Sequence, residues 1–143
     1  MTSVRPADGG DLESVCALDR LVAGDARRRS LAAAISAGRC LAATAGSRLV
    51  GYAIWDCSFY DQGFIKLLVV HPQHRRRGVA TALIRHIESV CPTEKLFTST
   101  NESNVAMQRV CQGLGFMRTG YIENLDEGDP ELVYFKRLRS RGR

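Results

Sequence analysis

The sequence predicts an α/β fold with one mixed, mostly antiparallel central sheet flanked by helices. The chain has 143 residues, a length typical of one domain. Segments with a helical apolar period alternate along it with strand-like segments. Three strand-like segments follow one another between residues 40 and 72, as in an antiparallel meander. We therefore expect the order βααββββαβαβ, or one close to it, in a single domain at residues 1–137.

The first 40 residues predict a short strand and two helices. TSVRPA is strand-like and ends at Pro6, and DLESVCALDRLV has its apolar residues on one side of a helix. Asp8 or Asp11 is the expected cap of this helix. Asp25 is expected to open a second, alanine-rich helix that stops before Gly38. The arginines at 27–29 are expected on the solvated face of that helix.

The middle of the chain predicts the meander. CLAATA, LVGYAIWDCSF and FIKLLVVHP are strand-like runs, and Gly46-Ser47 and Asp61-Gln62-Gly63 separate them as turns. Residues 65–70 are apolar except Lys66, so we expect a central strand that is buried on both faces.

The last third alternates helices and strands. A helix is expected from about residue 78 to 90, and KLFTST is the next strand. NESNVAMQRVCQGLGF predicts a helix that ends near Gly115. FMRTGYI and ELVYFKRL then form two strands around the acidic loop ENLDEGDP, and residues 138–143 form a basic tail that we expect to be disordered.

Composition narrows the class of protein. The net charge of +5 fits an anionic ligand, but also nucleic acid or solubility alone. Five cysteines without a CxxC pair argue against a disulfide framework or a zinc ribbon and favour a reducing, cytoplasmic location. The first residues lack an apolar signal core, and no run approaches the ~18 apolar residues of a membrane span.

The stretch HPQHRRRGVATALI, at residues 71–84, predicts an anion site. It follows an apolar strand and leads directly into a helix, whose first N–H groups have no partner within the helix. The helix dipole adds partial positive charge there, and glycine lets a ligand approach the backbone. A phosphate or pyrophosphate fits such a site best. The alternative is a solvated basic turn that precedes a helix.

Two motifs identify a family resemblance. LLVVHPQHRRRGVATALIRHIE resembles the pyrophosphate loop of the GNAT superfamily of acyl-CoA-dependent N-acyltransferases, and NVAMQRVCQGLGF resembles a second motif of that family. The predicted order of strands and helices is similar over nearly the whole chain. The resemblance implies a GNAT-like fold, acetyl-CoA as co-substrate and no metal.

The resemblance also implies the residues that would bind coenzyme A. The backbone of a strand edge would bind the pantetheine arm, and the amides of residues 76–81 would hold the pyrophosphate. Arg75 begins the motif and could instead pack locally, and Arg76 stands where the family often has glycine. Asn104 could contact the pantetheine arm or cap a helix. The full set is Leu68, Val69, Val70, Arg75, Arg76, Arg77, Gly78, Val79, Ala80, Thr81 and Asn104.

The catalytic residues match the family less well. The N–H of Val70 is the expected oxyanion donor. Lys66 and Leu67 stand near the usual glutamate, and Cys111 occupies the position of the usual tyrosine acid. Cys111 could be an acid, a core residue or an acyl-carrying nucleophile, and we prefer the core. Asp61 is a weak candidate for the base, and His71, which could also serve, fits a turn better.

The acceptor is predicted only by class. Carboxylates of the acidic loop suggest a cationic acceptor, although solvated loop charge is their ordinary role; aromatic residues near the third strand could wall its pocket or pack in the core. These candidates are Trp55, Tyr60, Glu123, Asp126 and Asp129.

The predicted function is transfer of an acetyl group to a primary amine of a small molecule or peptide. The alternative is a non-catalytic acyl-CoA-binding sensor or partner module. Specific nucleic-acid binding is not expected, because the arginine clusters lack aromatic interleaving and a recognition helix. A membrane partner is not expected either, because no apolar run is long enough to span a bilayer. A homodimer remains open.

Overall fold

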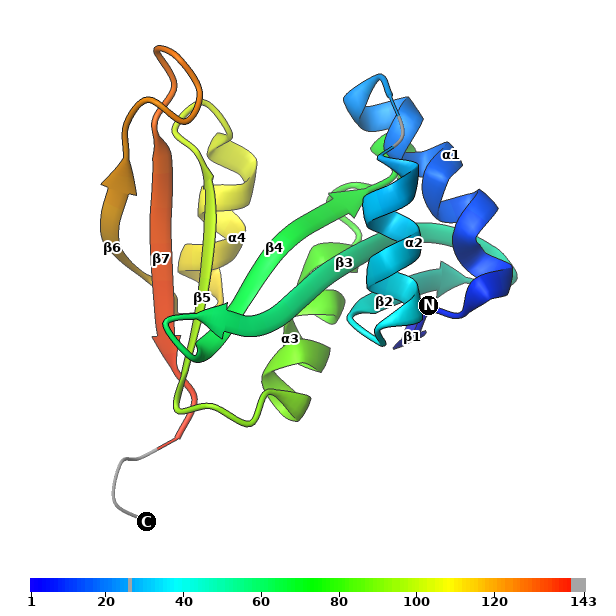
Figure 1. Cartoon of the computed structure of the whole chain (residues 1–143), viewed down its shortest axis with the longest axis horizontal. Helices are drawn as coiled ribbons and strands as arrows, with labels where there is room; N and C mark the ends of the chain where they lie inside the picture. The colour runs from blue at the N-terminus through cyan, green and yellow to red at the C-terminus, as the bar shows by residue number, and fades with distance from the viewer. Residues whose placement is uncertain (26, 140–143) are drawn as a thin grey trace. The chain divides into compact units, whose positions relative to one another are not determined.

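The computed structural model describes the whole chain except Ala26 and residues 140–143. The described residues form seven strands and four α-helices (Figure 1). The elements are β1 (Thr2–Pro6), α1 (Leu12–Ala23), α2 (Arg28–Ser36), β2 (Cys40–Ala45), β3 (Arg48–Phe59), β4 (Gln62–Val70), α3 (Val79–Val90), β5 (Lys95–Asn101), α4 (Val105–Gly113), β6 (Met117–Ile122) and β7 (Glu131–Arg137). Two single-turn helices, η1 (Gly9–Asp11) and η2 (Pro72–His74), precede α1 and α3.

The predicted fold class is confirmed. The strands are hydrogen-bonded in the order β1-β2-β3-β4-β5-β7-β6. The β1–β2, β2–β3, β5–β7 and β6–β7 pairs are antiparallel, and β4–β5 is parallel. The observed order, βααβββαβαββ, differs from the predicted order in the place of one strand: three strands, not four, lie between α2 and α3, and two strands, not one, follow α4. Among the described residues, no helix is long and apolar enough to cross a bilayer.

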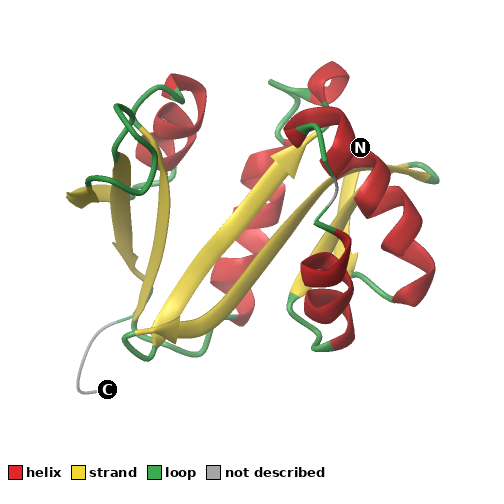
Figure 2. Cartoon of the chain, turned by 45° about the horizontal axis from the view of Figure 1, so that its top comes forward, coloured by secondary structure: helices red, strands yellow, loops and turns green. Residues whose placement is uncertain are grey.

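The chain divides into two compact units, where a single domain at 1–137 was expected. Unit 1 comprises residues 1–55 and 67–89, and unit 2 comprises residues 56–66 and 90–143. The long β3–β4 hairpin, visible in Figure 2, contributes residues to both. Of the predicted tail, residues 140–143 lie outside the described residues, whereas Leu138 and Arg139 are hydrogen-bonded to the segment before β5.

In unit 1, helices cover both faces of the sheet. Neighbouring residues of β3 point to opposite faces. Tyr52 lies in the buried cluster with Val15 and Leu31 of α1 and α2. A Cβ atom at Gly51 would instead meet Val79 and Leu83 of α3.

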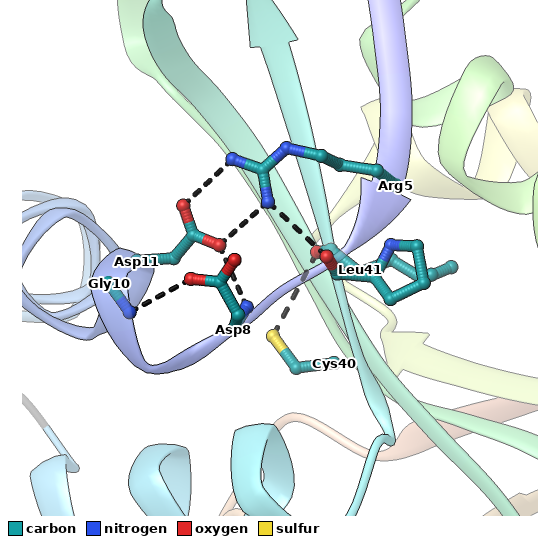
Figure 3. Close-up of polar contacts among 7 residues, drawn as sticks. Arg5, Asp8, Gly10, Asp11, Cys40 and Leu41 are labelled. Carbon is teal, nitrogen blue, oxygen red and sulfur yellow. Dashed lines mark hydrogen bonds and ion pairs between the residues drawn. The ribbon is translucent and has the colours of Figure 1, made fainter.

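Asp11 is the N-cap residue of α1 but makes no side-chain cap bond to that helix, and Asp8 caps the single-turn helix η1 that precedes it. The Asp8 carboxylate accepts the N–H of Gly10 at 2.8 Å, and the Asp11 carboxylate accepts the N–H of Asp8 at 2.8 Å. These two bonds form a reciprocal capping box at η1. Figure 3 shows that Arg5 reaches from β1 to Asp11, with bonds of 2.7 and 2.9 Å. The Arg5 hydrogen bond lowers the pKa of Asp11, although burial opposes the shift.

Two expectations about the β3–β4 hairpin are wrong. The turn is Tyr60-Asp61, both with positive φ, as in a type I′ hairpin, and Gln62 and Gly63 already belong to β4. Gly63 is needed for packing, because a Cβ there would lie 2.5 Å from Cys91 Sγ. The run 65–70 is not buried on both faces: Ile65 and Val69 are buried, whereas the other residues of the run are partly or fully exposed. Apolar composition alone does not report how much of such a strand is covered.

A third expectation is wrong at the start of α2. The helix begins at Arg28 rather than near Asp25, and Arg27 is its N-cap residue. Arg27 does not lie on a purely solvated face, because its guanidinium and its backbone N–H both bind Asp19 of α1.

Asp19 is a fully buried carboxylate and joins three elements of unit 1. Tyr52 donates its hydroxyl to Asp19 Oδ1 at 2.6 Å. Arg27 donates from Nη2 to Oδ1 at 2.6 Å and from its backbone N–H to Oδ2 at 3.0 Å. Burial acts to raise the pKa of Asp19, but these hydrogen bonds outweigh burial and lower the pKa to about 2. Burial raises the pKa of Tyr52, and its bond to Asp19 raises it further.

We expect the Asp19 network to stabilise the fold above pH 4 and to weaken in acid. The pKa of Asp19 is lower in the folded chain than its ordinary value of 3.8. Its ionisation therefore contributes about 2 kcal/mol that is fully present above the unfolded pKa and is lost as pH falls toward 2. In urea unfolding, the stability difference between the wild type and Asp19→Asn should shrink from pH 6 to pH 3.

The exposed Asp25→Asn variant is the control and should unfold like the wild type at each pH. A wild-type advantage over Asp19→Asn that stays constant from pH 6 to pH 3 would contradict the ionised network.

Candidate functional site: the loop between β4 and α3

The connection from β4 to α3 is a short, hydrogen-bonded segment of unit 1. The N–H of His71 donates to Val50 O at 2.8 Å, which fixes the end of β4 to β3. The His71 ring accepts the N–H of Gln73 through Nδ1 at 3.1 Å and caps η2. His71 is thus a residue of the turn, as the sequence predicted. Residues 75–78 then form a turn that leads into α3.

Two residues of this turn have left-handed backbone. Arg76 has a φ of 62° and Gly78 a φ of 79°. Glycine adopts this region freely, whereas another L-residue pays about 1–2 kcal/mol. The family preference for glycine at the position of Arg76 therefore has a conformational reason. Strain held in a loop of this kind is typical of functional sites.

The first turn of α3 presents backbone donors to the loop. The N–H of Ala82 bonds to Gly78 O at 2.9 Å and begins the helical pattern. Helix geometry leaves the N–H groups of Val79, Ala80 and Thr81 without partners inside the helix. Val79 is buried, Ala80 is partly buried and Thr81 is exposed. These amides and the positive end of the helix dipole favour an anion.

The arginines of the loop add unpaired positive charge. Arg75, Arg76 and Arg77 are all exposed, and within the part of the chain that the structure describes none of them forms an ion pair. Guanidinium groups that are free to move can bind phosphate oxygens in a forked geometry. Loop and helix start together are suited to a phosphate-bearing ligand.

His74 lies against the same positive charge. Burial lowers the pKa of His74, and Arg77, Arg48 and His71 lower it further. Its Nδ1 atom is buried without a hydrogen-bond partner among the described residues. The ring stands edge-on to His71, with 5.4 Å between the ring centres. His74 therefore favours its neutral form beside this loop.

Gly51 sets the position of α3. A Cβ atom there would lie 2.8 Å from Val79 Cγ1 and 3.0 Å from Val69 O. Contacts shorter than 3 Å require one of the elements to move. Glycine on β3 is therefore what allows the first turn of α3, with its free amides, to lie close to the end of β4.

The remaining predicted cofactor residues lie on β4 and at the start of α4. Val69 is buried, and Leu68 and Val70 are partly exposed. Asn104 is exposed, and its Oδ1 accepts the N–H of Met107 at 3.2 Å. The helix-cap interpretation of Asn104 is thus confirmed. A contact of these residues with a pantetheine arm stays a prediction.

Cys111 lies in the core of unit 2. It is fully buried near Leu114 and Phe116, and burial raises its pKa to about 11. Such a thiol keeps its proton at neutral pH, which disfavours a nucleophilic thiolate. Its surroundings agree with the core interpretation that the sequence favoured.

Asp61 and Lys66 are both exposed, and a role of Asp61 as the base stays a prediction. Asp61 is an exposed turn residue. Lys66 is exposed, and its Nζ lies 3.4 Å from Asp56 Oδ2. The Lys66 partner Asp56, which was not among the predicted residues, is a largely buried carboxylate on β3 that also accepts the N–H and the hydroxyl of Ser58. Burial acts to raise the pKa of Asp56, but the bonds from Ser58 and the charge of Lys66 lower it. Asp-x-Ser is a local turn pattern that could have drawn attention to it.

The predicted acceptor residues are not equivalent. Both carboxylate oxygens of Asp129 are bonded to Ser103, to its N–H at 3.0 Å and its hydroxyl at 2.6 Å. Asp126 accepts Asn101 Nδ2 at 2.8 Å. These two aspartates hold the loop before α4. Glu123, which lies in the same acidic loop between β6 and β7, is exposed.

The two aromatic candidates differ in exposure. Trp55, in unit 1, is partly buried, and its backbone N–H donates to Arg39 O at 3.1 Å. Tyr60, in unit 2, is 85% exposed at the hairpin turn. In the described part of the chain, no three or more His, Cys, Asp or Glu side chains are grouped so that they could hold a metal ion.

Comparisons with known proteins agree with the fold. The model of the Acetyltransferase (GNAT) family matches residues 13–116. A GNAT-family acetyltransferase from Bacillus cereus is 40% identical, with a TM-score of 0.91 over 96% of this chain and 97% of that protein. The ribosomal-protein-S18-alanine N-acetyltransferase from Escherichia coli is 17% identical, with a TM-score of 0.86 over 99% and 97%. The yncA protein of Salmonella typhimurium, solved with acetyl-CoA, is 15% identical, with a TM-score of 0.84 over 99% and 96%. The last two show the fold alone.

A curated relative is similar over a shorter part of the chain. Cysteine-rich protein 2-binding protein of the mouse is 31% identical over 96 residues, which is 62% of this chain. The aligned part is 12% of that protein's length, so the chain spans a small fraction of this relative.

We expect Gly51→Ala to destabilise the fold by about 1–3 kcal/mol, because the added methyl group overlaps Val79 and the carbonyl of Val69. Urea unfolding at neutral pH measures the change. Gly113→Ala in α4, where a Cβ meets nothing within 4 Å, is the control and should be neutral or stabilising. If Val79→Ala does not recover part of the loss in the double variant, the contact is not its cause.

We expect Arg76→Gly to raise the free energy of unfolding by about 0.5–1 kcal/mol, because glycine relieves the left-handed strain. Arg75→Gly is the matched control. Arg75 has a φ of −69°, so glycine there only adds freedom to the unfolded chain and should lower stability. Equal effects of the two substitutions would show that Arg76 is not strained.

Proposed function

Because the chain belongs to the GNAT family of acetyltransferases, we propose that it transfers the acetyl group of acetyl-CoA directly to a primary amine. The observation that carries the proposal is the loop between β4 and α3. There, exposed guanidinium groups adjoin a helix start whose first amides have no helical partner. A pyrophosphate is the group that this arrangement would bind best.

The loop would hold the diphosphate of coenzyme A mainly through backbone nitrogen. The amides of residues 76–81 would donate to the phosphate oxygens, and Arg76 and Arg77 would add charge. The backbone of Leu68, Val69 and Val70 would bind the pantetheine arm as an added strand does. Holding the thioester and the amine side by side would supply much of the rate enhancement.

The chemistry requires a neutral amine and a polarised thioester carbonyl. An amine with a pKa near 10.4 is only about 0.04% neutral at pH 7, so a base acting through water or a desolvating site must assist. The N–H of Val70 is the proposed donor to the oxyanion. Because Cys111 keeps its proton, it remains available only as a weak acid toward the leaving sulfur, and its burial favours a packing role.

The acceptor is proposed to be a cationic amine of a small molecule or a peptide. A peptide acceptor is consistent with the Escherichia coli relative, which is named for acetylation of a ribosomal-protein alanine. Glu123 is the carboxylate that we propose to attract the ammonium group, since Asp126 is hydrogen-bonded to Asn101 and Asp129 to Ser103.

A non-catalytic acyl-CoA-binding module is the second candidate. It is favoured by two observations: Lys66 stands near the position of the usual glutamate, and the usual tyrosine is replaced by the buried Cys111. Such a module would use the same loop but would need neither a base nor an acid.

We expect calorimetry to detect coenzyme A binding that depends on the loop arginines. Arg76→Ala with Arg77→Ala should weaken binding at least tenfold, because each charged contact contributes about 1.5–3 kcal/mol. Arg20→Ala with Arg29→Ala removes the same charge from exposed positions of α1 and α2 and is the matched control. Equal losses in both pairs would indicate general electrostatic attraction rather than a site.

Turnover separates the two candidates. Thiol release from acetyl-CoA should rise with at least one member of a panel of polyamines, amino acids and peptide N-termini. Binding without release across the panel would favour the module. No heat with coenzyme A, while the fold is intact by circular dichroism, would overturn both.

A further inference from the structure

Two cysteines of unit 2 lie on one face of the β3–β4 hairpin. Asp56 of β3 contacts Lys66 of β4 at 3.4 Å, so these two side chains share a face of the hairpin. Neighbouring residues of a strand point to opposite faces, which places Cys57 on the other face together with Gly63. A Cβ atom at Gly63 would lie 2.5 Å from Cys91 Sγ, so the sulfur of Cys91 covers that second face. Cys57 and Cys91 are therefore neighbours, although the whole of α3 lies between them in the chain.

The hydrogen bonds around Cys91 fix the direction of its S–H group. Thr93 has one hydroxyl proton and donates it to Lys95 O at 2.8 Å. In its 3.1 Å contact with Cys91 Sγ, Thr93 Oγ1 must therefore accept, so that Cys91 donates its S–H. Thr93 Oγ1 also accepts the N–H of Gly63 at 3.0 Å. The lone pairs of Cys91 Sγ are left for Cys57, whose thiol is hydrogen-bonded to Cys91.

The two thiols differ in their access to solvent. Cys57 is partly exposed, whereas Cys91 is only 1% exposed. A reagent in solution therefore reaches Cys57 first and finds Cys91 beside it. The remaining cysteine of unit 2, Cys111, is buried near Tyr134 instead. An accessible thiol next to a protected one suits a pair in which the first cysteine is oxidised and the second resolves the product.

We propose that Cys57 and Cys91 form a peroxide-responsive pair that closes to a disulfide bond. The oxidant is a hydroperoxide. Cys57 loses its proton, and its thiolate attacks the peroxide: a sulfur–oxygen bond forms, the O–O bond breaks, and Cys57 becomes a sulfenic acid while an alcohol or water leaves. The sulfur of Cys91 then attacks the sulfur of Cys57. The S–S bond forms, the S–O bond breaks, and the thiol proton of Cys91 leaves with the oxygen as water. The two sulfurs together lose two electrons, which the peroxide gains.

The disulfide ties the β3–β4 hairpin to the segment that leads from α3 into β5. It replaces the bond from Cys91 to Thr93 and closes a covalent loop that contains α3, which restricts the unfolded chain. Burial raises the pKa of Cys57, and the neighbouring Cys91 and Asp56 raise it further. Little thiolate is therefore present at neutral pH, and oxidation of Cys57 should accelerate as the pH rises from 7 to 9.

Peptide mapping of the peroxide-treated chain tests the pair. Dilute, folded protein is treated with hydrogen peroxide at pH 8, the remaining thiols are alkylated, and the chain is digested without reductant. The cross-linked Cys57–Cys91 peptide should be the main disulfide product, and dithiothreitol should release it. The midpoint of thermal melting should rise by about 5 °C or more on oxidation and return to its first value on reduction.

Substitutions separate the two steps of the reaction. In Cys91→Ala the sulfenic acid of Cys57 cannot be resolved, so dimedone should label Cys57 far more than it does in the wild type. Cys57→Ser, at the partly exposed position, should abolish both the cross-link and the shift in melting. Cys111→Ala removes another thiol of the same unit and is the matched control, which should still form the Cys57–Cys91 peptide. Circular dichroism establishes that each variant is folded.

The pair is overturned if the folded wild type yields no Cys57–Cys91 peptide after peroxide treatment. It is also overturned if Cys57 proceeds to sulfinic acid while Cys91 remains a free thiol, or if Cys57 is joined to Cys111 as readily as to Cys91. None of these measurements uses coenzyme A, so their failure would leave the proposed function untouched.

Discussion

The close contact between β3 and α3 at Gly51 is the constraint on which the rest of unit 1 depends. A helix start can bind an anion only if its first amides point into space that a ligand can enter. Here the helix is held so near the sheet that a single methyl group at Gly51 would overlap Val79 and the carbonyl of Val69. The other face of β3 is occupied by Tyr52 and the cluster beneath α1 and α2. β3 therefore packs against α3 on one face and against the cluster beneath α1 and α2 on the other. The position of α3 in turn sets the path of the loop that joins β4 to α3.

The buried Asp19 holds α1 and the start of α2 against β3. A carboxylate without solvent is costly unless every oxygen is satisfied. Tyr52 and Arg27 satisfy it from a strand and from the start of the next helix. The geometry of the α1–α2 connection is thus set by one acid and its donors rather than by the helix-forming tendency of the connecting residues. This explains why Arg27, and not the aspartate that precedes it, is the N-cap residue of α2, which begins at Arg28.

The elements that depend on local patterns in the sequence could be predicted, whereas contacts between residues far apart in the chain could not. Apolar periods and glycine positions were enough to place all four α-helices and seven strands within a few residues. Gly63 was interpreted as a turn residue, but the reason for glycine there is the sulfur of Cys91, which is 28 residues later in the chain. Asp19 and Asp56 were missed because an acid on a helix or strand normally faces water, and only their distant partners reveal that they do not. The acidic loop illustrates the reverse: charges that suggested a ligand are in part engaged with Asn101 and Ser103.

All five cysteines are free thiols, and burial shields most of them from solvent. Cys16, Cys40, Cys91 and Cys111 are buried, and Cys57 is partly exposed. Burial raises the pKa of Cys57 as it does that of Cys111, so even the most accessible sulfur is mostly in its less reactive protonated form. Protection of these thiols against oxidants and alkylating reagents comes from packing rather than from pairing in disulfides. Reagents that modify cysteine would then report on transient opening of the chain, with Cys57 reacting first.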